Sequence, residues 1–239
     1  MNYLLFPGNP PAVYHYELWG REIIAQVPGA RVRVSHYPDI EPTTDSPKVM
    51  RDILDAHFEQ LKSFHQSSGE PVTLIGHSLG AHFVMGLLER APGLIQKAIL
   101  IHPFLRMPSL RGRIIVGSAG SLYTQDRFQK VILRSRKTLE RFAAELSHVK
   151  NEEILRTFHI ARHESVTIAR DRSPIVIQSN LRNKIQVFYT PGDTWCQPST
   201  VADLRKQVSV HECPEPHGFI MTEKHRRNLF NRILSVPPR

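Results

Sequence analysis

The sequence predicts one α/β domain, in which helices cover both faces of a mostly parallel sheet. Three observations predict this class. Short apolar runs alternate with helical patterns at both ends of the chain. A length of 239 residues suits a single domain of this kind, and 41% hydrophobic residues are enough for a sizeable core. The middle of the chain lacks the alternation, so we expect a core of residues 1–102 and 185–239 with an insertion of residues 103–184.

The first half of the core alternates strand and helix. Tyr3–Phe6 is a short apolar run that stops at a Pro-Gly pair, and Tyr14–Val27 has helical spacing and ends at a second Pro-Gly pair. Polar and apolar residues alternate over Arg31–Ser35, which predicts a strand. The apolar residues of Pro47–Phe64 fall on one helical face, which predicts a helix. The same patterns then predict a strand over Val72–Ile75, a helix over Leu79–Leu88 and a strand over Lys97–Ile101.

The alternation resumes after the insertion, where it predicts two strands and two helices. The expected elements are a strand over Ile185–Tyr189, a helix over Ser199–Gln207, a strand over Val208–His211 and a closing helix over Lys224–Leu234. Because each strand is followed by a helix, neighbouring strands run in the same direction and the sheet is covered on both faces.

The insertion accounts for the whole net charge. It has 16 Lys and Arg residues against 7 Asp and Glu, which equals the +9 of the full chain. Asp126–Val149 predicts a helix with one apolar and one basic face, and Glu153–Ala161 predicts a second helix. Such a helix suits a membrane interface, so we expect a helical lid that contacts anionic lipid peripherally. Two alternatives remain: the apolar face packs on the core, or the basic face binds an acidic protein.

Composition argues against several other classes. No apolar run approaches the ~20 residues that span a bilayer, and no basic segment precedes Pro7, so we expect neither a transmembrane segment nor a signal peptide. Cys196 and Cys213 make no disulfide scaffold, which favours free thiols and a cytoplasmic location. No His/Cys cluster has metal-ligand spacing, so no metal or other cofactor is expected. Trp and Tyr residues do not cluster in the basic insertion, as stacking on single strands would require, so we expect no nucleic-acid partner.

The sharpest motif is Gly76-His77-Ser78-Leu79-Gly80, set between a predicted strand and a predicted helix. A nucleophilic serine on such a tight turn projects its Oγ above the sheet. Side chains two positions before and after the serine would collide with neighbouring backbone, which explains both glycines. Ser78 is therefore the candidate nucleophile.

A serine needs a histidine base, and in this arrangement the chain order is Ser, acid, His. His217 lies in a loop after the last predicted strand and before the closing helix, where a catalytic imidazole would lie over the sheet. His211 lies within that strand. His225 lies on the final helix beside Arg226 and Arg227, and we expect it to be solvated.

The acid is expected after the preceding strand. Asp193 follows Ile185–Tyr189 and so lies at the carboxyl end of that strand, where ligands meet such a sheet. Asp203 lies on the next helix and Asp171 lies in the insertion. The alternative for Asp193 is a turn-forming role after a glycine.

Two N–H groups are needed for the oxyanion of acyl transfer. One is the backbone N–H of Leu79, directly after the nucleophile. The other is expected from the loop after the first strand, where Gly8 allows a tight fold and Asn9 supplies the N–H. Pro10 and Pro11 have no N–H and stiffen this loop.

Together these motifs resemble the lipid droplet-associated hydrolase family of the α/β-hydrolase superfamily. The resemblance covers residues 1–102 and 185–225 and rests mainly on Pro7-Gly8-Asn9-Pro10 and Asp193-x-Trp195-Cys196. It implies an α/β-hydrolase fold, a triad of Ser78, Asp193 and His217, and Asn9 in the oxyanion loop. It also implies hydrolysis of an ester or lipid, with Gly8 and Trp195 beside the substrate, at a membrane or lipid droplet surface. Pro11 and Gly218 depart from the family pattern.

The sequence therefore predicts a serine esterase that forms an acyl-enzyme on Ser78. The same triad serves thioesterases and amidases, which the residues do not separate from esterases. A protein of another class, which binds a lipid surface and retains an idle triad, is the remaining alternative.

Overall fold

The structure is a computed structural model that describes residues 1–39, 45–114, 117 and 151–237. Its centre is a six-stranded sheet in the order β2-β1-β3-β4-β5-β6, and every neighbouring pair is parallel. The strands are β1 (Asn2–Phe6), β2 (Arg31–Val34), β3 (Val72–His77), β4 (Ile95–Ile101), β5 (Ile185–Tyr189) and β6 (Ser209–Glu212). The predicted parallel α/β class is confirmed.

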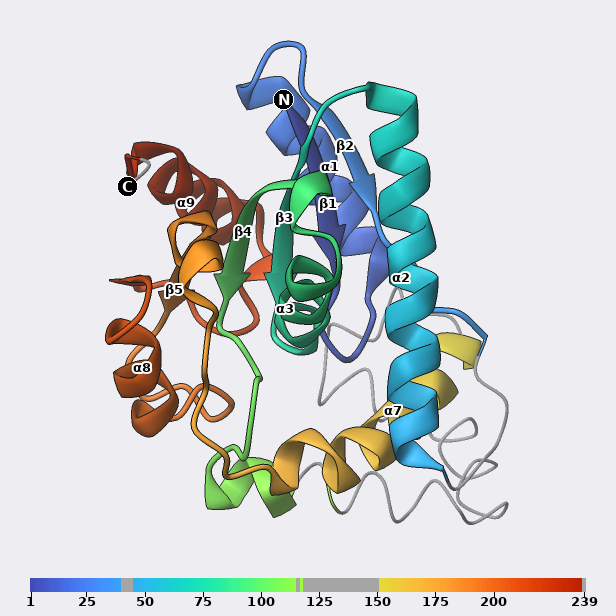
Figure 1. Cartoon of the computed structure of the whole chain (residues 1–239), viewed down its shortest axis with the longest axis vertical. Helices are drawn as coiled ribbons and strands as arrows, with labels where there is room; N and C mark the ends of the chain where they lie inside the picture. Colours follow the sequence, from blue (N-terminus) through green and yellow to red (C-terminus); the bar gives the residue numbers. More distant parts are fainter. Residues whose placement is uncertain (40–44, 115–116, 118–150, 238–239) are drawn as a thin grey trace.

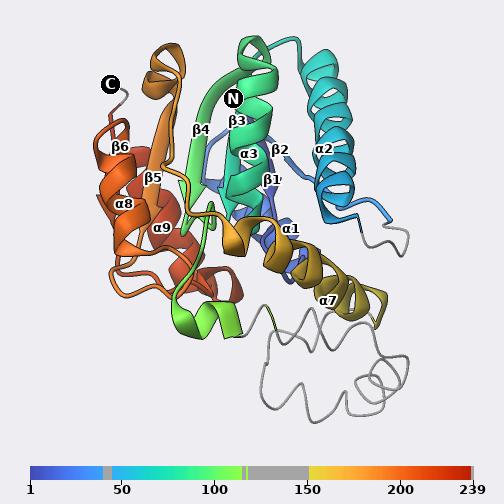
Figure 2. The same ribbon diagram turned by 60° about the horizontal axis from the view of Figure 1, so that its bottom comes forward.

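Helices cover both faces of this sheet (Figures 1 and 2). One face carries α1 (Val13–Gln26) and α9 (Glu223–Ser235). The other carries α2 (Ser46–Ser68), α3 (Leu79–Arg90) and α8 (Pro198–Arg205). The described residues also include the 3₁₀ turns η1 (Pro92–Leu94), η3 (Ile168–Arg170), η4 (Ser179–Lys184) and η5 (Phe219–Met221).

The strands divide their side chains between two apolar layers. On β1, Leu4 and Phe6 join the layer under α2 and α3, whereas Tyr3 and Leu5 join the layer under α1 and α9. All four are buried. This two-residue alternation between two buried layers explains why β1 is a nearly continuous apolar run, since neither of its faces is left to water.

The strand order reverses direction between β1 and β3. From β1 the chain moves outward to β2, then returns past β1 to β3 and continues to β6. In open α/β sheets, ligands bind at the carboxyl ends of the strands where the order reverses. Pro7–Pro11, after β1, and Ser78, after β3, both lie at this point.

The described part of the insertion includes α7 (Asn151–Val166), which contains the predicted helix over Glu153–Ala161. α7 packs against α2 and runs across the carboxyl end of the sheet (Figure 2). Its Ile160 joins an apolar cluster with Leu79 and Phe104. The predicted helix over Asp126–Val149 lies outside the described residues, so the separate lid of residues 103–184 stays a prediction.

Helix α2 extends beyond its predicted bounds at both ends for clear local reasons. α2 begins one residue earlier than predicted, because the Asp45 side chain accepts a hydrogen bond from Lys48 N at 3.0 Å. It continues to Ser68, where Gly69 ends it in the left-handed conformation at φ 70°.

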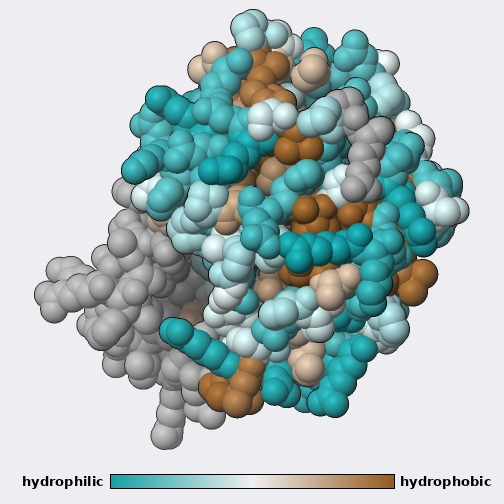
Figure 3. Space-filling view, turned by 90° about the vertical axis from the view of Figure 1, so that its left-hand side faces the viewer, coloured by the Kyte–Doolittle hydropathy of each residue, from teal (hydrophilic) through white to brown (hydrophobic). Residues whose placement is uncertain are grey.

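Figure 3 shows the side of the molecule that carries α8 and α9, which is mainly hydrophilic with small separate apolar patches. Across the described ranges, no helix is both long and apolar enough to cross a membrane.

Candidate active site

Ser78 occupies the tight turn between β3 and α3. Its backbone has φ 52° and ψ −117°, a region that non-glycine residues rarely adopt. Backbone hydrogen bonds hold the turn, from Ser78 N to Ile101 O at 2.9 Å and to Ser78 O from Ala81 N and Phe104 N, both at 3.1 Å. The sharp turn predicted from the glycine spacing is therefore present, with Ser78 at its apex.

The glycines on either side of Ser78 are required by close backbone approach. A Cβ at Gly80 would lie 2.2 Å from the carbonyl oxygen of Phe6, and one at Gly76 would lie 2.7 Å from the Cα of Ala81. Both neighbours are backbone atoms, which no side-chain rotation can move away. The absence of a Cβ at Gly80 thus allows α3 to start directly against the end of β1.

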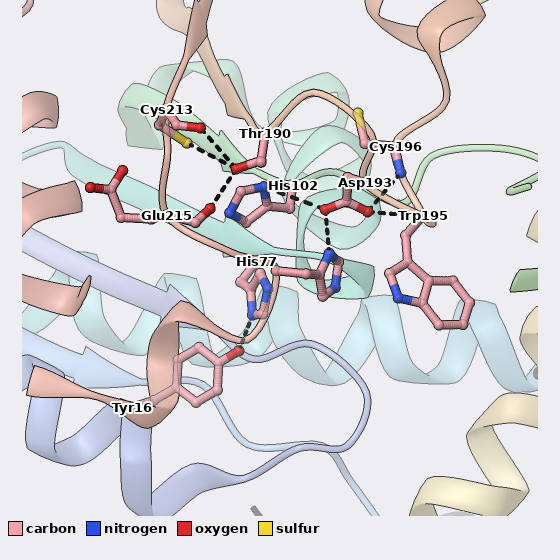
Figure 4. A network of polar contacts seen from close by, with 10 residues as sticks. Tyr16, His77, His102, Thr190, Asp193, Trp195, Cys196, Cys213 and Glu215 are labelled. Carbon is pink, nitrogen blue, oxygen red and sulfur yellow. Dashed lines mark hydrogen bonds and ion pairs between the residues drawn. The ribbon is translucent and has the colours of Figure 1, made fainter. Parts of the chain in front are cut away.

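Asp193 and His217 meet at the carboxyl edge of the sheet. Nδ1 of His217 donates to Oδ2 of Asp193 at 2.7 Å. The other oxygen, Oδ1, accepts from the backbone N–H groups of Trp195 at 2.6 Å and Cys196 at 3.2 Å (Figure 4). The Asp193 side chain is only 1% exposed, whereas that of His217 is 27% exposed. The carboxylate is buried and fully bonded, and the imidazole reaches solvent.

Electrostatics keep Asp193 ionised. Burial raises the pKa of this carboxyl, but the hydrogen bond and charge interaction with His217 and the Trp195 N–H outweigh it, so the pKa lies below its ordinary value. Asp193 therefore fixes the tautomer of His217 that carries its proton on Nδ1, which leaves Nε2 as a base.

The His217 ring lies 4.9 Å, centroid to centroid, from the ring of His77, which precedes Ser78 in the chain. Ser78 Oγ and His217 form no direct hydrogen bond in this structure. In unliganded sites such contacts are often long and tighten when substrate binds. The geometry thus places His217, the candidate base, beside the turn of Ser78 and joins it to Asp193.

The residues that were weighed as alternatives have other partners. Asp203 pairs with Arg106 at 2.9 Å on the surface of α8. Asp171 accepts from Ser173 N at 2.8 Å within its own turn. His211 stacks on Phe188 with ring centroids 5.1 Å apart.

The loop after β1 is fastened from three sides. Gly8 N donates to the hydroxyl of Tyr16 at 3.0 Å, and this hydroxyl also pairs with His77 Nδ1 at 2.5 Å (Figure 4). The Tyr37 hydroxyl donates to Pro7 O at 2.9 Å. The side chain of Asn9 donates from Nδ2 to Thr157 O on α7 at 3.1 Å.

These contacts leave two backbone donors at the site. The N–H of Gly8 is hydrogen-bonded to the Tyr16 hydroxyl and is therefore not free to bind an oxyanion. The next N–H of the loop belongs to Asn9. Within the described part of the chain, the backbone N–H groups of Asn9 and Leu79 form no hydrogen bond. Leu79 begins α3, and the first N–H groups of a helix have no partner inside the helix.

Gly8 and Trp195, which the resemblance places beside the substrate, both adjoin the triad residues. A Cβ on Gly8 would lie 2.9 Å from the Cβ of Ser78. The Trp195 ring lies 5.7 Å from Phe104 and 6.1 Å from His217, between ring centroids. Trp195 thus forms an apolar wall beside the imidazole.

Sequence reasoning missed a second histidine at the acid. His102 follows β4, and its Nδ1 lies 3.5 Å from Asp193 Oδ2 (Figure 4). Its backbone has φ 45°, which is rare for a non-glycine residue. Burial, and then the neighbouring His217, lower the pKa of His102 to about 3, so this ring is neutral. The sequence does offer one signal for His102, which is a polar residue directly after the apolar residues of β4.

Cys196 and Cys213 are free thiols, as predicted, and both are buried. Burial raises the pKa of Cys196 to about 12 and that of Cys213 to about 11. Both are protonated at neutral pH and unreactive as nucleophiles. As for metals, the described residues contain no group of three or more His, Cys, Asp or Glu arranged to hold an ion.

Sequence comparison finds no matching family model and no matching curated protein. Structural comparison finds many similar solved structures. The chain is similar to RedJ, a thioesterase of the prodiginine pathway in Streptomyces coelicolor. The RedJ structure with a PEG molecule bound is 17% identical to this chain, with a TM-score of 0.59. The match covers 98% of this chain and 90% of that chain.

Two further structures show the same likeness. The Vlm2 thioesterase domain is 16% identical, with 99% of this chain and 94% of that chain covered and a TM-score of 0.62. The 2-hydroxy-6-oxo-6-phenylhexa-2,4-dienoate hydrolase of Rhodococcus sp. strain RHA1 is 14% identical, with 98% and 88% covered and a TM-score of 0.62. At these identities, the likeness concerns the fold.

Proposed function

We propose that this chain, which has the α/β-hydrolase fold, is a serine hydrolase that cleaves carboxylic esters through an acyl-enzyme on Ser78. The observation that carries the proposal is the hydrogen bond between buried Asp193 and partly exposed His217, beside the strained turn of Ser78. Nucleophile, base and acid in this arrangement are the parts that acyl transfer to a serine needs.

In the first half of the reaction, His217 Nε2 takes the proton of Ser78 Oγ as the oxygen attacks the ester carbonyl carbon. Negative charge moves to the carbonyl oxygen, where the N–H groups of Leu79 and Asn9 stabilise it. The carbonyl then re-forms and the bond to the alcohol oxygen breaks. His217 gives its proton to that oxygen, so an alcohol leaves and the acyl group stays on Ser78.

In the second half, water replaces the alcohol. His217 takes a proton from the water, and the hydroxide oxygen attacks the acyl carbon. The oxyanion forms at the same two N–H groups. When it collapses, the bond to Ser78 Oγ breaks, His217 returns its proton to that oxygen, and a carboxylic acid leaves. Asp193 stays ionised throughout and stabilises the imidazolium that forms in each half.

A lipid or acyl ester is the proposed substrate class. The apolar cluster beside the nucleophile turn supports it, since Leu79, Phe104 and Ile160 are buried together with Trp195 packed against them. The resemblance of the loop and acid motifs to lipid droplet-associated hydrolases favours the same class, and with it a cytoplasmic protein at a membrane or lipid droplet surface. Contact with anionic lipid through the basic insertion is part of this proposal.

Thioester hydrolysis is the second candidate, because two of the similar structures are described as thioesterases. A panel of nitrophenyl esters of increasing chain length, run beside the matching acyl thioesters, separates the two. We expect kcat/KM to be higher for esters and to rise with chain length. A preference for thioesters at every chain length would replace the ester proposal.

The test of the proposal itself is covalent labelling with a fluorophosphonate probe. The wild-type protein should be labelled and Ser78→Ala should not, while the exposed control Ser179→Ala should be labelled like wild type. Equal labelling of Ser78→Ala would end the assignment of the nucleophile. Absence of labelling in the wild type would favour a non-catalytic lipid-binding protein.

A further inference from the structure

A cavity of about 300 Å³ lies at the end of the sheet opposite the triad. It is lined by residues near the start of β3, β4, β5 and β6 and by residues near the end of α9. The triad residues follow the carboxyl ends of the strands, which α7 crosses, so the two places are separated by the length of the strands (Figure 1). Ligand pockets in proteins enclose roughly 300–1,000 Å³, so the cavity suits a small molecule.

Polar side chains from four neighbouring strands line one side of this cavity. They are Thr73 of β3, Lys97 of β4, Gln186 of β5 and Ser209 of β6. Thr73 pairs in register with Lys97, and Gln186 pairs with Ser209. The alternation of side chains along a strand puts them on the face that carries α1 and α9, where the next residue of β4 on that face, Ile99, joins the apolar layer. At the cavity, this layer therefore changes from apolar to polar.

The polar groups of this row have few partners in the protein. Thr73, Gln186 and Ser209 are buried. Across the described ranges, the hydroxyls of Thr73 and Ser209 form no hydrogen bond, and Gln186 Oε1 has no partner. Gln186 Nε2 donates to Pro237 O at 3.5 Å, which is longer than an ordinary hydrogen bond. Because buried polar groups nearly always have a hydrogen-bond partner, the row is suited to polar groups from outside the chain.

Lys97 gives the cavity a positive charge. Its side chain is partly buried and forms no ion pair with any residue that the structure describes. The described side chains that line the cavity include no Asp or Glu. Burial lowers the pKa of Lys97, and no neighbouring acid acts against it. An anion beside the ammonium group would offset the cost of this burial.

The remaining walls of the cavity are mainly apolar. Ile99 and Ile185 line it from the sheet, and Ile233 and Leu234 line it from α9. An inorganic anion would make no use of these walls, and a hydrocarbon would leave the charge of Lys97 unpaired. A carboxylate on an alkyl chain matches both kinds of wall.

The polar row can serve a carboxylate with donors alone. The Lys97 ammonium and the hydroxyls of Thr73 and Ser209 can each donate to its two oxygens. A half-turn of the Gln186 amide would present its NH₂ group as a further donor, at the cost of one long contact with Pro237 O.

We propose that this cavity is a second binding site, which takes the carboxylate of a small aliphatic acid: Lys97 and the polar row hold the carboxylate, and the apolar walls contact the alkyl chain. The site is independent of the chemistry at Ser78. The acid that the proposed ester hydrolysis releases belongs to the same chemical class, so a reaction product is one source of such a ligand.

The experiment is a titration of ¹⁵N-labelled wild-type protein with octanoate, followed by the NMR chemical shifts of the backbone amides. We expect saturable shifts at the amides of Lys97, Gln186 and Ser209. 1-Octanol has the same alkyl chain without the charge, so its affinity at these amides should be ~10-fold lower or less. Absence of saturable shifts at the cavity, or equal affinity for 1-octanol, would overturn the proposal.

A substitution identifies the residue that holds the carboxylate. Lys97→Met removes the charge and keeps a long side chain, so we expect it to weaken octanoate binding at the cavity by ~10-fold or more. The control Lys224→Met changes an exposed lysine near the start of α9 and should bind octanoate like wild type. Wild-type affinity at the cavity in a folded Lys97→Met protein would overturn the role of Lys97 and with it the proposal.

Two features of this design keep its outcomes distinct. Circular dichroism verifies the folding of each variant, and the comparison of octanoate with 1-octanol needs no substitution, so it decides the matter even if Lys97→Met does not fold. Fluorophosphonate labelling reports on Ser78 and the amide shifts report on the cavity. If the probe fails to label wild type but octanoate binds at Lys97, the function at Ser78 fails while the second site stands.

Discussion

Replacing Gly80 by alanine tests the link between backbone packing and catalysis most directly. The added Cβ would lie 2.2 Å from Phe6 O and 2.7 Å from Pro7 O. Non-bonded carbon contacts are ordinarily roughly 3.5 Å or longer. The first turn of α3 must therefore move away from the loop after β1 by about 1 Å, and it carries the N–H of Leu79 with it.

We expect this shift to lower both the stability of the protein and its catalytic rate. Overpacking in a well-packed core costs ~1–3 kcal/mol of stability. A displacement of about 1 Å between catalytic groups costs ~10²-fold in rate, which equals roughly 3 kcal/mol of transition-state stabilisation. Since the shift separates the Leu79 N–H from the Asn9 N–H, we expect the loss in kcat more than in KM.

The assay is nitrophenyl ester hydrolysis, with circular dichroism to verify folding and urea unfolding to measure stability. Gly93→Ala is the matched control, because a Cβ there meets no atom within 4 Å and the residue lies in η1, away from the turn. Its kcat should match wild type. A folded Gly80→Ala protein with wild-type kcat would refute the argument that this glycine sets the distance between the two donors.

Three further predictions concern single side chains. Asp193→Asn should lower kcat by ~10⁴-fold, because the amide would favour the wrong tautomer of His217. The control Asp203→Asn should leave kcat unchanged in the same ester assay. A folded and fully active Asp193→Asn protein would show that the acid lies elsewhere. Arg226→Met should cost ~3–5 kcal/mol in urea unfolding, because it leaves the carboxylate of Glu22 without its partner; an unchanged urea midpoint would contradict this. Thiol titration of the denatured, unreduced protein should find two thiols, and the folded protein should react far more slowly because both are buried with raised pKa values.

The sequence predicted most of the fold because local pattern and tertiary role agree in the core. Ile185–Tyr189 is apolar except at Gln186, and the structure buries every one of its side chains in a strand between β4 and β6. Arg226 shows the limit of such local patterns, because its partner lies far away in the chain. The Arg226 side chain is only 5% exposed and donates from Nε to Glu22, 204 residues earlier, at 3.0 and 3.1 Å. Local helical periodicity gives no signal for a partner so distant.

The same limit explains which parts of the candidate site escaped prediction. Ser78 stands out because its turn needs glycines at fixed spacing, and chain order then points to Asp193 and His217. Tyr16 and Asn9 form contacts between segments far apart in the chain, 61 residues to His77 and 148 residues to Thr157. A tyrosine inside an amphipathic helix looks the same in the sequence whether it faces solvent or a loop of the site.

The pair of histidines at Asp193 shows what geometry adds to chain order. His102 follows β4 and His217 follows β6, so both lie at the carboxyl end of a strand flanking β5. Only His217 is within 2.7 Å of the carboxylate and exposed to a substrate, while His102 lies at 3.5 Å and is fully buried. Because its pKa is about 3, His102 adds no positive charge that would compete with an imidazolium at His217. In the proposed mechanism, the site therefore exchanges protons with substrate through His217, while the neutral ring of His102 lies buried beside the same carboxylate.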